Sequence, residues 1–480
     1  MRRATALPLI DLGTVALGVF LTLATVMFVG RYGTGLGLAA PLGAILFVVL
    51  VAAFVFRPHM AVAATIPYFA VLPALRIYGS QMLGGTKDMI TLAATAAAAV
   101  IIVERRAGRR GWAADRPVLI LVAFLFGLYV LNIGGNLSGE SGYDVAWFHG
   151  VRLFSEPLFL LVVGLALPNP VKTYQWAVRS LIATAVVVTV VGCAQQVLGV
   201  TWLIESGYRY GRQVREISGH LRSFGTLDEP FSYAVLLLLA LAVVILRNRL
   251  RPSGYALVAL LSVGLLFSFV RTAALIVLAL IGIAIARRGQ TRFAVFVVLI
   301  AVVGSALLFA LTSDATSSRS VQISQSQYLT LNGRTGLWTS ALGDVPSQWV
   351  LGRGVGVVGT ASQRARESLT GAATDTRTPG GGTIVDSAFP EVAADVGFIG
   401  LGILLAVFGR LTVLAWRAAA RGLTSGWTAL GILAIVVLDA LTRESLTGFP
   451  TAYIAMLLLG LAAATWTADD PRSDPPPRTA

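Results

Sequence analysis

The stretch YALVALLSVGLLFSFVRTAALIVLALIGIAIA occupies residues 255–286 and decides the class of fold. As a single α-helix it would be about 48 Å long, because a helix rises about 1.5 Å per residue. The hydrocarbon core of a bilayer is only about 30 Å thick. The stretch therefore predicts two membrane-spanning helices, and its one charged residue, Arg271, marks the point where the first ends and the second begins.

The rest of the chain has the same apolar character. Hydrophobic residues make up 56% of it and charged residues 12%, with a mean hydropathy of +0.79. A soluble domain carries about 25% charged residues. The composition predicts an all-α polytopic membrane protein with about fourteen transmembrane helices. The expected spans are residues 9–30, 36–56, 59–77, 86–103, 117–134, 153–168, 176–199, 230–246, 254–270, 272–286, 293–311, 388–416, 426–441 and 446–466.

Arginine clusters between these spans predict the orientation, because cytoplasmic loops of membrane proteins carry an excess of Lys and Arg. With the spans above, all the clusters fall on one side, so both termini are expected to be cytoplasmic. The clusters are Arg2-Arg3, Arg105-Arg106 with Arg109-Arg110, Arg247 with Arg249 and Arg251, Arg287-Arg288 with Arg292, and Arg417 with Arg421. The segments expected to face outward are 135–152, 200–229, the surroundings of residue 271, 312–387 and 442–445.

Hydropathy also divides the chain into regions. We expect a transmembrane bundle at 1–311 that includes the outer loop 200–229, an extracytoplasmic loop at 312–387, and C-terminal helices at 388–466. The proline-rich tail 467–480 is expected to be disordered. The first apolar run lacks a small-residue cleavage site and is interpreted as an anchor, not a removed signal peptide.

The net charge of +14 has a simple interpretation in such a chain. Of its 37 basic residues only Lys87 and Lys172 are lysines, and much of the excess is topogenic charge, so no nucleic-acid partner is expected. The single cysteine, Cys193, leaves no intramolecular disulfide or thiolate metal site. The isolated histidines lack ligand spacing, so we expect neither a metal nor a cofactor.

Two arginines on the outer side need a different explanation. Arg271 interrupts an apolar stretch, and an arginine at the bilayer centre costs about 2.5–3.5 kcal/mol, so it must reach the interface or a polar cavity. It could snorkel at a helix junction. It could instead form an anion site with Arg222, because the planar guanidinium binds phosphate oxygens in pairs. Arg222 could also pair with Asp228 or Glu229, before Pro230 opens the next helix.

Several stretches carry a resemblance to a known family. They are Arg222-x-x-Gly225-Thr226 followed by Pro230, Ser268-x-x-Arg271, Gly333-Arg334-Thr335-Gly336-Leu337-Trp338, and Leu351-Gly352-Arg353-Gly354-Val355-Gly356. In this order, and all on the outer side, they resemble segments of the O-antigen ligase and polymerase superfamily. Its members transfer lipid-linked glycans at the outer face of the bacterial cytoplasmic membrane. The resemblance covers roughly residues 200–410.

A further stretch matches the family in spacing but not in one residue. Asp386-Ser387, nine residues, Gly397, two residues and Gly400 has the spacing of the family's ligase motif. Where the family has histidine, this chain has aspartate at position 386.

The resemblance implies a fold, a substrate and a mechanism. The fold would be GT-C-like, and the donor would be a glycan on undecaprenyl pyrophosphate in the membrane. The acceptor would be a hydroxyl group of a glycan, lipid or protein. Arg222, Arg271 and Arg334 would hold the pyrophosphate, and Asp386 would act as base. The reaction would be inverting and independent of metal, because arginines can offset the developing charge.

Other assignments stay open at this stage. Asp386 could instead pair with an arginine or cap the helix expected to start near Ala388, and Glu391 is an alternative base. Weaker candidates are Arg353 in the long outer loop and His149 in the 135–152 loop, where Glu140 and Asp144 also lie.

Two other functions are open as well. A lipid-linked oligosaccharide flippase or transporter would also be helical with embedded arginines, but it would place polar groups near mid-membrane. A glycosyltransferase that uses lipid-phosphate sugars would have an acidic pair in its first outer loop, and residues 31–35 contain no acid.

Overall fold

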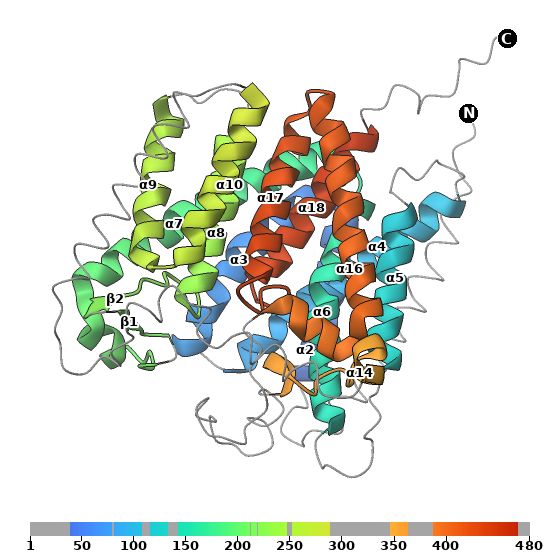
Figure 1. The fold of residues 1–480 in the computed structure, drawn as a ribbon, viewed down its shortest axis with the longest axis horizontal. Coiled ribbons are helices and arrows are strands. Elements are labelled where there is room, and N and C mark those ends of the chain that lie inside the picture. Colours follow the sequence, from blue (N-terminus) through green and yellow to red (C-terminus); the bar gives the residue numbers. More distant parts are fainter. Residues whose placement is uncertain are drawn as a thin grey trace.

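The computed structural model describes residues 39–78, 81–107, 116–132, 143–211, 213–217, 219–246, 252–288, 346–362 and 387–468. These residues are mostly helical (Figure 1). The helices are α2 (Ala39–Phe56), α3 (Pro58–Tyr78), α4 (Thr86–Ala107), α5 (Arg116–Leu131), α6 (Tyr143–Ala166), α7 (Pro170–Glu205), α8 (Pro230–Ile245), α9 (Pro252–Ser268), α10 (Arg271–Arg288), α14 (Pro346–Leu351), α16 (Ala388–Ala420), α17 (Thr424–Ala440) and α18 (Thr451–Ala468), with a 3-10 turn at Gln81–Gly85. The short strands β1 (Glu216–Ile217) and β2 (His220–Leu221) form an antiparallel pair.

The helices agree with the spans expected from hydropathy. Each expected span that falls within the described residues coincides with a helix, and the spans 9–30 and 293–311 lie outside them. The break expected at Arg271 is confirmed, since α9 ends at Ser268 and α10 begins at Arg271. The count of fourteen and the GT-C-like fold stay predictions.

Several described helices have the length and the apolar surface expected of membrane-spanning helices. Those long and apolar enough to cross one are Pro58–Tyr78, Leu83–Arg105, Asp144–Ala166, Pro170–Glu205 and Ala388–Ala420. Large apolar side chains also face outward from the bundle, such as Phe56, which is 80% exposed, and Val197, which is 87% exposed. Such surface is unfavourable in water and neutral against lipid, which explains why a helical membrane protein tolerates it.

Two of the loops expected to face outward are shorter than the sequence predicts. The expected loop 135–152 is wrong in its second half, because α6 begins at Tyr143 and places His149 on a helix. Its first turn is polar and includes Asp144, which is favourable near the positive end of a helix dipole. Likewise α7 continues past a kink at Gly199 to Glu205, inside the expected loop 200–229.

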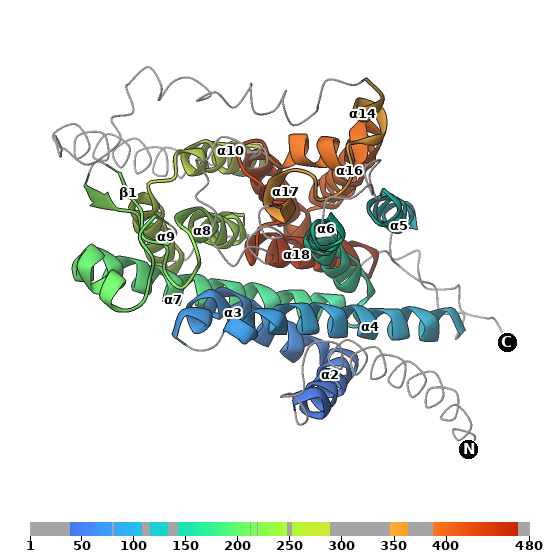
Figure 2. The ribbon, with the colours of Figure 1, turned by 90° about the horizontal axis from the view of Figure 1, so that it is seen from below.

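Two helices form the centre of the bundle. All residues from Ala452 to Trp466 of α18 are buried, and in α8 every residue after Phe231 is buried as well. A helix that is apolar all round belongs in the core of a large bundle. Figure 2 shows α8 and α18 enclosed by α6, α7, α9, α10, α16 and α17.

The bundle has two distinct ends. Figure 1 shows the β1–β2 pair, α14, the break between α9 and α10, and the starts of α8 and α16 at the lower end. The opposite end carries the ends of α10 and α16, with Arg287 and Arg417 in their last turns. The candidate residues of α8, α10 and α16 are therefore at the same end of the bundle.

One group of buried charges ties α4, α6 and α18 together, and we call it the Lys87 cluster. The Nζ atom of Lys87 lies 2.8 Å from carboxylate oxygens of both Asp88 and Glu156. Arg152 pairs with Asp88 at 3.2 Å, and the hydroxyl of Tyr453 donates to Glu156. Two cations thus face two carboxylates in a compact group.

Candidate active site

Arg222 lies in the turn between β2 and α8, where the chain meets the end of α9. Its side chain is buried, and Nε donates to the backbone oxygen of Ser268 at 3.2 Å. The next residue, Ser223, donates its backbone N–H to Phe267 at 2.8 Å. The guanidinium lies over the ring of Phe231 at 4.7 Å from its centroid. These contacts hold Arg222 beside the break between α9 and α10.

The break itself has a local cause. Phe269 adopts a left-handed conformation with φ of 51°, which a helix cannot continue through. Ser268 supports the turn, since its hydroxyl donates to Leu265 at 2.6 Å and accepts from the N–H of Val270 at 3.3 Å. The Ser268-x-x-Arg271 spacing thus corresponds to a real interruption, with Arg271 as the first residue of α10.

Three arginines influence one another here, and we call Arg215, Arg222 and Arg271 the arginine cluster. Burial is the main reason why the pKa of Arg222 falls to about 10. The positive charges of Arg215 and Arg271 also lower this pKa, while the carboxylate of Glu229 raises it. Arg222 therefore remains a cation at neutral pH, in a region of concentrated positive charge.

The alternative in which Arg222 pairs with Asp228 or Glu229 is not observed in the described part of the chain. Among the described residues, Arg222 forms an ion pair with neither Asp228 nor Glu229. Glu229 instead precedes α8 as its N-cap and accepts from Arg443 at 2.7 Å. The nearest acidic side chain on the same turn is thus committed to another partner.

Arg443 is a residue that the sequence analysis missed. It lies in the turn between α17 and α18 and donates to Asp439 at 3.0–3.2 Å as well as to Glu229. Although burial alone would lower it, the carboxylates of Asp439 and Glu229 raise the pKa of Arg443. Its guanidinium lies 5.2 Å from the centroid of Phe231, the ring that Arg222 also covers. The available signal was its place in the outward segment 442–445.

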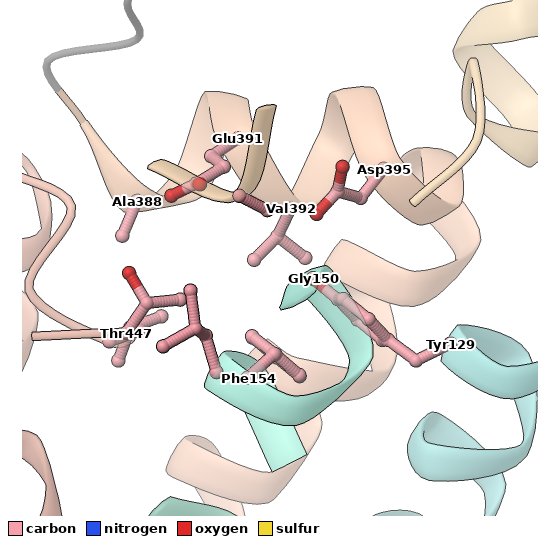
Figure 3. A pocket seen from close by; sticks show the side chains of 11 residues that line it. Tyr129, Gly150, Phe154, Ala388, Glu391, Val392, Asp395 and Thr447 are labelled. Carbon is pink, nitrogen blue, oxygen red and sulfur yellow. The ribbon is translucent and has the colours of Figure 1, made fainter. Parts of the chain in front are cut away.

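A second polar site lies at the start of α16. A cavity of about 10 Å³ is lined there by Glu391 and Asp395 from α16, Tyr129 from α5, and Thr447 from the turn before α18 (Figure 3). Both carboxylate side chains are buried, at 5% exposure each. Glu391 was an alternative base in the sequence analysis, whereas Asp395 was missed because it reads as an isolated polar residue within an apolar span.

The glycine-rich stretch after α14 packs directly on this part of α16. The N–H of Arg353 donates to the oxygen of Ala394 at 2.6 Å, and that of Gly356 donates to the Asp395 carboxylate at 3.1 Å. Gly397 has φ of 68° at a kink in α16, where any side chain would collide with the backbone of α14. Two stretches that resemble family motifs therefore form one structural unit.

The turn between α17 and α18 joins the two sites. The backbone oxygen of Arg443 accepts from the N–H of Ala388 at 2.9 Å, and Ser387 Oγ donates to Ala440 at 3.0 Å. The side chain of Arg443 meanwhile reaches Glu229 beside the arginine cluster. One turn thus contacts the start of α16 with its backbone and the start of α8 with a side chain.

The remaining predicted residues stand as follows. Asp386 and Arg334 lie outside the described residues. His149 lies on α6 next to Gly150, which lines the cavity, and Arg353 is half-buried on the stretch after α14. Within the described ranges no group of three or more His, Cys, Asp or Glu side chains could hold a metal ion.

Comparison with known proteins adds one finding. Residues 256–405 match a family model described as O-Antigen ligase. The match spans the break at Arg271, the stretch after α14 and the start of α16 with Glu391 and Asp395. A search of curated proteins finds no match to the chain.

Proposed function

Because residues 256–405 match the O-antigen ligase family, which supports a place in the superfamily of O-antigen ligases and polymerases, we propose a glycosyltransferase function for this protein. It transfers a glycan from undecaprenyl pyrophosphate to an acceptor hydroxyl at the outer face of the bacterial cytoplasmic membrane. The acceptor belongs to a glycan, a lipid or a protein. No cofactor takes part in this proposal.

The observation that carries the proposal is the charge state of Arg222. Its guanidinium is buried, and among the described residues no carboxylate forms an ion pair with it. A buried cation without a paired carboxylate is unfavourable unless something else neutralises it. A lipid pyrophosphate supplies that negative charge, and the planar fork of arginine suits its oxygens.

The chemistry follows from the positions of the charges. As the glycan leaves, the bond between the anomeric carbon and the pyrophosphate oxygen breaks, and its electron pair goes to the pyrophosphate. Arg222 and Arg271 stabilise that developing charge, and Arg334 is proposed to join them. The acceptor oxygen attacks the anomeric carbon from the opposite side, so the configuration inverts. An acidic residue, with Asp386 as one candidate, takes the acceptor's proton.

Topology is part of the proposal. The end of the bundle that carries the arginine cluster and the start of α16 faces outward, and both termini are cytoplasmic. The arginines in the last turns of α10 and α16 then lie on the cytoplasmic side, in agreement with the excess of basic residues usual there.

The test is glycan length in a strain that lacks the gene and carries variant copies. Arg222→Met, Arg271→Ala and Arg334→Ala are expected to leave short lipid-linked units in the outer leaflet and to lose polymer. Arg209→Met is the matched control, since Arg209 is exposed on the same outer loop. If all three variants restore full-length polymer, the proposed function is wrong. Loss of short units from the outer leaflet would identify a flippase instead.

A further inference from the structure

The cavity at the start of α16 has the size and lining of a site for one hydroxyl group. Its volume of about 10 Å³ suits a single water-sized group and excludes a sugar ring. Four polar side chains line it, from two helices and one turn: Tyr129 of α5, Glu391 and Asp395 of α16, and Thr447. Figure 3 shows the two carboxylates on successive turns of α16, with Tyr129 approaching from α5.

Tyr129 points to a ligand independently of the acidic pair. Its side chain is 0% exposed, and within the described part of the chain its hydroxyl has no hydrogen-bond partner. Its ring is held by stacking on Phe154, with centroids 4.0 Å apart and planes 6° from parallel. Buried hydroxyls nearly always have a partner. The hydroxyl of Tyr129 is therefore available to a group in the cavity.

Both carboxylates are held in place by the loop after α14. Asp395 Oδ1 accepts from the N–H of Gly356 at 3.1 Å, and Glu391 Oε1 accepts from the N–H of Thr360 at 3.3 Å. Gly359 permits the second contact, because a side chain there would collide with Glu391. The two acidic groups are thus oriented before any substrate binds, as a proton acceptor should be.

The cavity is also lined by residues on both sides of the segment 363–386 and lies beside the turn that contacts the start of α8. Ala361 and Ala388 both line it and flank the segment 363–386. Ala388 is hydrogen-bonded to Arg443, whose side chain reaches Glu229 at the start of α8. Glu391 lies in the first turn of α16, nearer to the start of the helix than Asp395.

We propose that the cavity receives the attacking hydroxyl of the acceptor and that Glu391 takes its proton. This inference rests on the proposed glycosyl transfer and names the group that activates the acceptor. The O–H bond of the acceptor breaks, its proton goes to the Glu391 carboxylate, and its oxygen forms the new bond to the anomeric carbon. The bond to pyrophosphate breaks with its electron pair. Tyr129 hydrogen-bonds the hydroxyl, and Asp395 keeps the stretch after α14 against α16 as a positioning residue.

The experiment uses the full chain, purified into liposomes with lipid-linked glycan extracted from the deletion strain. Glu391→Gln is expected to lower the transfer rate at least about 100-fold, the usual range for loss of a general base. Its affinity for undecaprenyl pyrophosphate should stay within about twofold of wild type, because the arginine cluster is intact. The acidic limb of the pH–rate profile, where the carboxylate is protonated, should disappear in this variant.

Further variants guard against a trivial loss of folding. Tyr129→Phe removes only a hydroxyl and should lower the rate about tenfold without changing undecaprenyl pyrophosphate affinity. Glu205→Gln is the matched control, since Glu205 is exposed at the end of α7. Full activity and an unchanged acidic limb in Glu391→Gln overturn the inference. If Asp386→Ala alone abolishes turnover, the base is Asp386 and the proposed function survives. If wild-type protein consumes no lipid-linked glycan, the proposed function itself fails.

Discussion

The Lys87 cluster and Arg222 of the arginine cluster both bring charge into the apolar bundle, yet their charges are arranged in opposite ways. In the Lys87 cluster two cations face two carboxylates at 2.8–3.2 Å. In the arginine cluster the buried Arg222 forms no ion pair with a described carboxylate and lies near two further cations. Charge that is neutralised within the protein stabilises a fold, whereas excess charge is available to a ligand.

Arg443 sharpens this difference because it shares the ring of Phe231 with Arg222. Arg443 holds Asp439 and Glu229, whereas Arg222 holds a backbone oxygen of Ser268. Two arginines side by side therefore have different expected roles. The balance of charge around each one, and not its residue type, distinguishes them.

The largest effect is expected for Lys87→Met. This change removes the closest cation from the buried carboxylate of Glu156 and leaves Asp88 paired with Arg152 alone, and breaking such a buried pair typically costs about 3–5 kcal/mol. The free energy of unfolding in detergent, measured by thermal or denaturant melting, should fall by about that amount. The chain offers a matched control in Lys172→Met, because Lys172 is exposed at the start of α7 and should be neutral.

A smaller loss is expected for Arg443→Met. It removes the partner of Asp439 and Glu229, but the side chain of Glu229 is 33% exposed and can be hydrated. We expect a loss of about 2–3 kcal/mol in the same melting experiment. Adding Glu229→Gln should recover part of it. If the double variant is no more stable than the single one, the pair with Glu229 contributes little.

Arg222→Met is expected to leave the free energy of unfolding almost unchanged and to impair ligand binding instead. Removing an uncompensated buried charge should change the free energy of unfolding by less than about 1 kcal/mol, or raise it. The variant should nevertheless lose the increase in melting temperature that undecaprenyl pyrophosphate, the proposed ligand, is expected to produce in the wild type. A destabilisation as large as that of Lys87→Met would remove the distinction between the two clusters. Arg209→Met is the control for the loss of one outer arginine.

The smallest effect concerns pH. Burial lowers the pKa of Arg222 to about 10, so the unfavourable burial of its charge is fully present below that pH. Its contribution to stability therefore improves only as pH rises above about 10 toward the higher pKa of the unfolded chain.

Binding of the proposed ligand, undecaprenyl pyrophosphate, should consequently not change from about pH 7 to about pH 9 through titration of Arg222. Arg222→Lys should bind progressively less as pH rises through the same range, because the pKa of a lysine is lower than that of an arginine and burial lowers it further. Parallel titrations of the two proteins check this. A wild-type midpoint in that range would assign the binding to another group.

Much of the helical arrangement was predictable from local sequence. Hydropathy located the described helices, and the arginine within residues 255–286 located the break at Arg271, which the structure confirms. Pro230 was predicted in the first turn of a helix, and it is the first residue of α8. Such features depend on neighbouring residues. The start of α6 was misplaced because Asp144, His149 and Arg152 lower the hydropathy of its first turns although they are helical.

The candidate site was predictable only in part. Arg271 was identified as a charge within an apolar stretch, Arg222 as an arginine on the expected outer side, and Glu391 as an alternative base near Asp386. Arg443 and Asp395 were missed, because their partners are distant. Arg443 reaches Glu229 across 214 positions, and Asp395 reaches Gly356 across 39. No local pattern reports such pairs.

The sequence by itself determined the membrane class, the approximate positions of the long described helices and the interruption at Arg271, because hydropathy and backbone preference act over a few residues. The tertiary structure alone decided which buried charges are neutralised. In the folded chain Glu229 forms an ion pair with Arg443, and Glu391, Asp395 and Tyr129 line one cavity. Ion pairs and cavities depend on distances in space, and the folding of the bundle sets those distances.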